Sequence, residues 1–232
     1  MDANLRRHDE QVSPDKKLAF AYAPAGDRAA LTALFAIDAA MGDVVRSTTE
    51  PMLGPIRLAW WRERLEELDR GAPAPAEPRL QAVERELVAR GIAGTEVAAL
   101  EGGWLSLFDP FPWTVETSEA VWFRGRTLFW LGARVLGRPD EAIQSAGGIW
   151  ALVDAARHCS DAPSRAMFLD QARRFARALA DARFPWSLRP LSMLVAMAVR
   201  ALRRGEPFEA EATPGRAAAM LAHRFSGRLK QP

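Results

Sequence analysis

Apolar side chains recur at helical spacing along almost the whole of this 232-residue chain, and no segment shows the apolar–polar alternation of a half-buried strand. Proline and glycine interrupt the pattern at short connectors, of which GAPAPAEP (71–78) is the longest. We therefore expect an all-α bundle forming a single domain over 1–232. The predicted helices run from Asp27 through Val45, from Pro51 to Gly71, and over 80–90, 96–108, 117–136, 141–159, 165–182, 188–203 and 213–229.

The composition is that of an ordinary globular protein, with 49% apolar and 26% charged residues. A lone cysteine, Cys159, cannot form an internal disulfide, and we expect it to have a structural role. The polar segment 1–16 lacks the apolar stretch of a signal peptide and is expected to be flexible. The longest apolar run, 191–199, is too short to cross a membrane, so we expect a cytoplasmic protein.

Charge is distributed unevenly along the chain. From Arg157 onward there are 14 basic and 6 acidic residues, a balance of +8, whereas the preceding part carries −6. A net charge of +2 argues against a nucleic-acid-binding protein. The basic C-terminal third can be a solvated face, or it can contact an anionic ligand, an acidic partner or the surface of an anionic membrane.

Common catalytic motifs are missing from the sequence. It contains no phosphate-binding loop, no dinucleotide fingerprint, no H-E-x-x-H and no C-x-x-C. Three histidines are too few for a histidine-rich metal site. His158 and Cys159 are neighbours in a predicted helix and point about 100° apart, so they are not expected to form a catalytic dyad.

Polar residues within apolar helices are the remaining site candidates. Asp154, Arg157, His158 and Asp161 fall at i, i+3, i+4 and i+7, which is one stripe of the predicted helix 141–159 and its continuation. Two interpretations are open for this stripe. The carboxylates can hold a divalent cation while Arg157 pairs with a diphosphate, or Arg157 can bridge Asp154 and Asp161 as a surface ion pair.

A second polar set lies on the helix that begins at Asp27. Asp38 and Asp43 are five residues apart and do not share a face of that helix, whereas Asp43 and Arg46 do. The spacing predicts a charge pair between Asp43 and Arg46 and not a metal clamp.

Aromatic residues are dominated by tryptophan, with eight tryptophans and one tyrosine. We expect most of them in the core, although some can line an apolar tunnel for a hydrocarbon ligand. Apolar side chains surround the predicted helix 117–136, from Val121 to Leu131, which places this helix near the centre of the bundle.

Two stretches resemble the squalene/phytoene synthase family. The first is LTALFAIDAAMGDVVRSTTEPMLGPIRLAWWRERLEEL (31–68), in which P-M-L-G and R-L-A-W-W-R are the most specific elements. The second is VWFRGRTLFWLGARVLG (121–137) followed by GGIWALVDAARHCSD (147–161), which keeps the spacing of the family's central helices. The resemblance covers about 17–182. It implies an isoprenoid-synthase-type bundle around a central cavity, in which two aspartate-rich motifs hold Mg²⁺ against a prenyl diphosphate.

The two motifs depart from the pattern of active family members. In the first motif Gly42, Asp43 and Arg46 occupy the aspartate positions. In the second motif the family's Asn, Arg, Asp and later Asp correspond to Asp154, Arg157, His158 and Asp161. The resemblance is nearest to the branch of a mitochondrial complex I assembly factor, which is non-catalytic.

Two functions follow from the resemblance. The first is a non-catalytic protein that binds a lipid or prenyl ligand or a protein partner in assembly, with a peripheral membrane contact through its basic C-terminal third. The alternative is a Mg²⁺-dependent transferase acting on farnesyl or geranylgeranyl diphosphate. Its metal ligands would be Asp43, Asp154 and Asp161, and Arg157 would bind the diphosphate.

Overall fold

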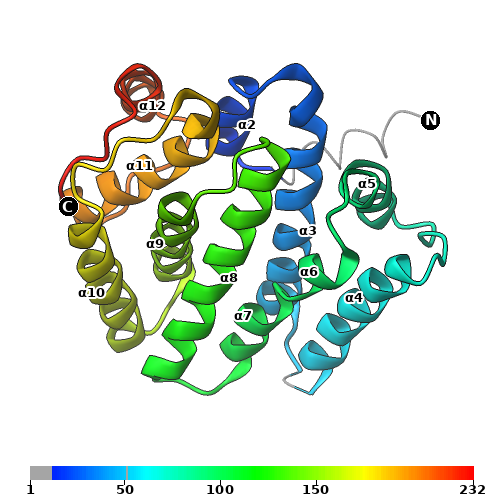
Figure 1. The fold of residues 1–232 in the computed structure, drawn as a ribbon. Helices are drawn as coiled ribbons and strands as arrows, with labels where there is room; N and C mark the ends of the chain where they lie inside the picture. The colour runs from blue at the N-terminus through cyan, green and yellow to red at the C-terminus, as the bar shows by residue number, and fades with distance from the viewer. Residues whose placement is uncertain (1–11, 51) are drawn as a thin grey trace.

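The computed structural model describes residues 12–50 and 52–232, and within these the secondary structure is helical (Figure 1). The expected all-α bundle is confirmed. Its α-helices are α2 (Pro14–Ala21), α3 (Arg28–Ser47), α4 (Leu53–Asp69), α5 (Pro78–Glu86), α6 (Gly94–Ala98), α7 (Glu101–Leu105), α8 (Val115–Val135), α9 (Glu141–His158), α10 (Ala162–Ala178), α11 (Arg189–Arg204) and α12 (Pro214–Ser226). Short 3₁₀ turns cover Ala25–Asp27, Val88–Arg90, Ser106–Phe108 and Trp186–Leu188.

Capping side chains and prolines begin several of these helices. The Asp140 carboxylate accepts a hydrogen bond from the backbone N–H of Ile143 at the start of α9. Thr213 caps α12, which has a proline in its first turn. The prediction of one continuous helix over 96–108 was wrong, because this segment forms α6, α7 and a 3₁₀ turn.

Helices α8 and α9 pack against each other at the middle of the bundle (Figure 1). Their axes approach closely because Gly125 faces Gly147: a Cβ added to Gly125 would lie 2.3 Å from the carbonyl oxygen of Gly147. On one side lie α3 to α7, and on the other lie α10 to α12. The expectation that 117–136 is central is met, although Phe123 on this helix is 56% exposed.

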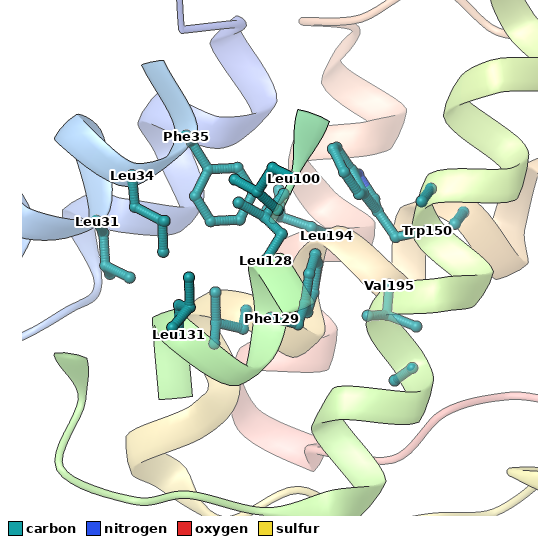
Figure 2. Close-up of a cluster of buried hydrophobic side chains, with 14 of the residues drawn as sticks. Leu31, Leu34, Phe35, Leu100, Leu128, Phe129, Leu131, Trp150, Leu194 and Val195 are labelled. Carbon is teal, nitrogen blue, oxygen red and sulfur yellow. The ribbon is translucent and has the colours of Figure 1, made fainter. Parts of the chain in front are cut away.

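Three aromatic rings pack together among aliphatic side chains in the core between α3, α8 and α9 (Figure 2). The ring of Phe35 lies 5.9 Å from both Phe129 and Trp150, and Phe129 lies 5.5 Å from Trp150. Such ring pairs stabilise a core beyond the burial of their area. The cleft beside Trp150 encloses only about 30 Å³, so the large cavity expected from the resemblance is not present at this point.

Most of the tryptophans lie in or against the core, as predicted. Trp61, Trp104 and Trp150 are buried, whereas Trp60 and Trp186 are 41% and 54% exposed. The remaining three, Trp113, Trp122 and Trp130, are partly buried against the core.

The N-terminal expectation is partly wrong. Residues 1–11 lie outside the described residues, but α2 begins at Pro14 and Asp15 is only 5% exposed, so the end of segment 1–16 is folded into the bundle. Among the described residues, no helix combines the length and the apolar character needed to cross a membrane.

Candidate functional site

A buried arginine that the sequence analysis did not single out lies at the centre of the site. Arg124 on α8 is 2% exposed, and its Nη1 lies 3.2 Å from Asp38 Oδ1 on α3. Trp104 donates its indole N–H to the same carboxylate oxygen at 2.9 Å, and its ring stacks 3.7 Å from the Arg124 guanidinium. The available signal was the spacing of Val121, Arg124 and Leu128, which places this arginine on the buried face of α8.

Asp154 on α9 faces the same guanidinium. Its Oδ2 lies 3.7 Å from Arg124 Nη2, and its side chain is 23% exposed. Burial raises the pKa of Asp154, but positive charges outweigh that effect and hold the pKa below its ordinary value. In order of effect, these charges are those of Lys16, Arg124, His158 and Arg46.

The predicted stripe of four polar residues is wrong in its last member. Helix α9 ends at His158 because Cys159 adopts an extended backbone, and Asp161 is the N-cap of α10. The Asp161 carboxylate accepts from the N–H of Ser164 at 2.9 Å and from its hydroxyl at 2.6 Å, and these bonds lower the pKa of Asp161. Asp161 is therefore occupied in starting a helix.

The surface ion pairs proposed for Arg157 are also not formed. Its Nη1 donates to the backbone carbonyl of Glu209 at 3.1 Å, and its guanidinium lies 5.0 Å from the ring of Phe208. The neighbouring His158 lies with Nδ1 2.8 Å from the backbone carbonyl of Asp154. Cys159 is buried, its thiol donates to the carbonyl of Asp161, and burial raises its pKa, which fits the expected structural role.

The first motif shows the predicted charge pair. Arg46 Nη2 donates to Asp43 Oδ1 at 2.7 Å, and both side chains are about half exposed. Asp43 lines an open groove of about 350 Å³ with Trp60 and Trp61, whereas Asp154 lines a separate cleft. The structure thus does not bring Asp43, Asp154 and Asp161 together as ligands of one metal ion.

Gly42 occupies the remaining position of the first motif. A Cβ added there would lie 2.7 Å from the Trp104 ring and 3.1 Å from Arg46 Nη1. A carboxylate at this position has no room unless Trp104 moves, so the space that an aspartate would need is filled by an indole ring.

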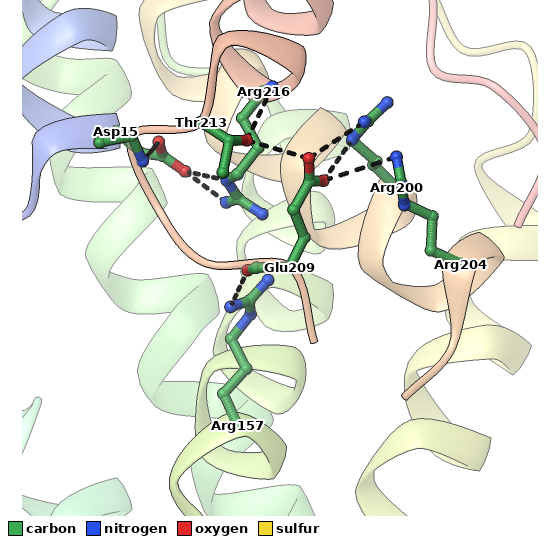
Figure 3. A network of polar contacts seen from close by, with 8 residues as sticks. Asp15, Arg157, Arg200, Arg204, Glu209, Thr213 and Arg216 are labelled. Atoms are coloured by element: carbon green, nitrogen blue, oxygen red, sulfur yellow. Dashed lines mark hydrogen bonds and ion pairs between the residues drawn. The ribbon is translucent and has the colours of Figure 1, made fainter. Parts of the chain in front are cut away.

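A small cleft opens next to Asp154, between α2, α9, α11 and the segment before α12. Its polar lining consists of Ser13, Asp15, Lys16, Asp154, Arg157, Glu211 and Arg216. Arg216 binds Asp15 through Nε and Nη2, and Figure 3 shows how the loop before α12 brings Arg216 and Glu209 beside Arg157.

Two guanidinium nitrogens of this cleft have no partner among the described residues. They are Arg157 Nη2 and Arg216 Nη1, and both are buried. Burial, and next the charge of Arg216, lower the pKa of Arg157 from its ordinary value, although an arginine stays protonated. Two like charges face each other with unused donors, which is an arrangement that an oxyanion can satisfy.

Magnesium does not fit the residues of this site. Mg²⁺ prefers carboxylate oxygens and water in an octahedron, but Arg124 already lies between Asp38 and Asp154. No group of three or more His, Cys, Asp or Glu side chains in the described part of the chain is placed to hold a metal ion.

Comparisons with known proteins found no matching family model, no matching curated protein and no matching solved structure. The resemblance to squalene/phytoene synthases therefore stays a prediction.

Proposed function

We propose that this chain is a non-catalytic protein of squalene/phytoene synthase type that binds the anionic head group of a prenyl or lipid ligand in the cleft beside Asp154. The observation that carries the proposal is the pair of buried, unpartnered nitrogens, Arg157 Nη2 and Arg216 Nη1. A buried donor without a partner costs about 1–3 kcal/mol, and a phosphate oxygen between the two guanidinium groups would remove that cost.

The charges of the cleft are compatible with an anion. Three carboxylates line it, but Asp15 is bonded to Arg216, and Asp154 faces Arg124. The third, Glu211, is exposed to solvent. Because a water molecule needs about 10–15 Å³ of such space, a cleft of about 30 Å³ has room for two or three phosphate oxygens and not for a prenyl chain, which would lie outside it.

The buried Arg124 supports a function without catalysis. Breaking the bond to a diphosphate leaving group needs strong neutralisation of its developing charge, which metal ions supply in such reactions. Here the guanidinium is held by Asp38 and Trp104 inside the bundle, so its charge is already matched. The alternative, a Mg²⁺-dependent prenyl-diphosphate transferase, and the assembly role implied by the resemblance stay predictions.

Calorimetric titration with farnesyl diphosphate and with inorganic diphosphate in EDTA tests the proposal. Both ligands should bind without Mg²⁺, and Arg157→Gln should weaken binding about tenfold, the worth of one charge-assisted hydrogen bond. The matched control is Arg165→Gln, which removes an arginine of α10 that pairs with Glu206 outside the cleft. Absence of binding to both ligands, or equal losses in the two variants, would overturn the proposal.

A further inference from the structure

The basic C-terminal third contains two different sets of cations. Several of its arginines are structural: Arg189 donates to the backbone carbonyl of Arg224, Arg200 pairs with Glu209, and Arg216 with Asp15. Arg224 itself is buried, with its guanidinium 3.5 Å from the Trp186 ring. These arginines are held within the fold and are not available to a partner. Only the other cations of the C-terminal third can form the contact surface that the charge distribution suggested.

Five of these other cations gather on one surface, which we call the basic groove: Arg173, Arg177, Arg203, Arg228 and Lys230. Arg173, Arg177 and Arg203 line an open hollow of about 370 Å³ with Leu202 and Pro232. Arg203, Arg228 and Lys230 line a second hollow of about 100 Å³ between α11 and α12. Since Arg203 belongs to both, the two hollows adjoin.

No acidic residue lines either hollow. None of the five cations forms an ion pair with a carboxylate in residues 12–50 and 52–232, whereas Arg174, also on α10, pairs with Asp170 at 3.0 Å. The groove is thus a site where positive side chains are in excess, contributed by α10, α11 and the segment after α12 (Figure 1).

The second hollow also has an apolar floor, formed by Met197 and Val199 of α11 and by Ala219 and Ala222 of α12. Cations around an apolar floor match an amphiphile with an anionic head and an apolar body. Free phosphate would make no use of the floor, and no Phe, Tyr or Trp ring, on which the bases of single-stranded nucleic acids stack, lines either hollow.

We propose that the basic groove binds anionic phospholipid head groups at a membrane surface. Each cation near such a surface contributes roughly the free energy of a fivefold change in affinity, so the five together give a measurable, salt-sensitive attachment. The proposal does not depend on the cleft beside Asp154, which shares only Met197 with the lining of the second hollow.

Vesicle sedimentation of the full chain tests this. The protein should sediment with phosphatidylcholine vesicles containing about 30 mol % phosphatidylglycerol at low salt, and not with phosphatidylcholine alone. Arg177→Gln with Arg203→Gln should reduce binding about 25-fold, while the matched variant Arg174→Gln with Arg85→Gln should change it little. All four side chains are exposed, so unfolding does not confound the comparison, and thermal unfolding of each variant checks this.

Equal sedimentation with neutral vesicles, or equal losses in the two double variants, would overturn the proposal. So would tight binding of inorganic phosphate, polyglutamate or duplex DNA by a protein that does not sediment with anionic vesicles. Arg157→Gln serves as a cross-check because it should weaken diphosphate binding and leave vesicle binding intact, so the two proposals can fail separately.

Discussion

Arg124 on α8 and Asp38 on α3 form an ion pair inside the bundle, with 3.2 Å between Nη1 and Oδ1 and side chains only 1% and 3% exposed. The two residues are 86 positions apart in the sequence, and the pair joins two helices across the core. The Arg124 guanidinium also lies near the carboxylate of Asp154 on α9, so this one arginine is shared by two carboxylates. This arrangement underlies the proposed absence of catalysis.

Breaking this pair should destabilise the protein strongly. Asp38→Ala removes the carboxylate nearest to Arg124 and the acceptor of the Trp104 indole N–H, leaving only the more distant Asp154 at 3.7 Å. This should lower the free energy of unfolding by about 3–5 kcal/mol in urea titrations. Asp43→Ala, which removes the half-exposed partner of Arg46, should cost less than about 1 kcal/mol. Similar losses in the two variants would contradict the buried pair.

Restoring an aspartate of the first motif should also destabilise the fold. In Gly42→Asp, the new Cβ would overlap the Trp104 ring, and overpacking of this kind costs about 1–3 kcal/mol. Gly102→Ala in α7 is the matched control, because a Cβ there meets nothing within 4 Å and should be neutral or slightly stabilising. A stable Gly42→Asp protein would show that Trp104 does not close this position.

Asp161 should matter for stability and not for ligand binding. Asp161→Ala removes the N-cap of α10 and should lower the free energy of unfolding by about 1 kcal/mol, while Asp161→Asn, which can still cap, should retain most of it. Diphosphate affinity, measured by calorimetry, should not change in either variant. If either variant lost diphosphate affinity without losing stability, Asp161 would have to be part of the ligand-binding site.

Stability should fall in mild acid because of His223. Burial, and with it the nearby charge of Arg189, lowers the pKa of His223 to about 4, against the effect of its hydrogen bond to the carbonyl of Arg228. The unfolded chain takes up this proton near pH 6.5 and the folded chain near pH 4. The contribution of His223 is therefore complete above about pH 6.5 and is lost as the pH falls to about 4, on the order of 3 kcal/mol.

Urea titrations across this pH range check the prediction. His223→Gln should flatten the loss because the side chain no longer titrates, although its bond to Ser192 is altered as well. An unchanged slope in His223→Gln would contradict the account.

The helical fold could be predicted from the sequence because periodicity and proline and glycine positions are local signals. The stripe of Asp154, Arg157, His158 and Asp161 failed for a physical reason: it assumed an unbroken helix, and the extended backbone of Cys159 ends α9 two residues before the cap of α10. Asp161, followed by alanine, proline and serine, carried the sequence pattern of an N-cap.

The Arg124–Asp38 pair could not be predicted in the same way. Each residue could be placed on a buried helical face, but which faces meet depends on the packing of α3 against α8, which no local pattern specifies. The burial of each tryptophan also depends on how the helices pack. Trp60 and Trp61 are adjacent in the sequence, yet Trp60 is 41% exposed and Trp61 is 8% exposed.

Diphosphate release and ligand binding, measured together with farnesyl diphosphate, test the central claim most directly. We expect saturable binding in EDTA and no release of diphosphate when Mg²⁺ is added, for the unmodified chain and for Asp154→Ala. Release that requires Mg²⁺ and disappears in Asp154→Ala would contradict the account, and would identify an active transferase.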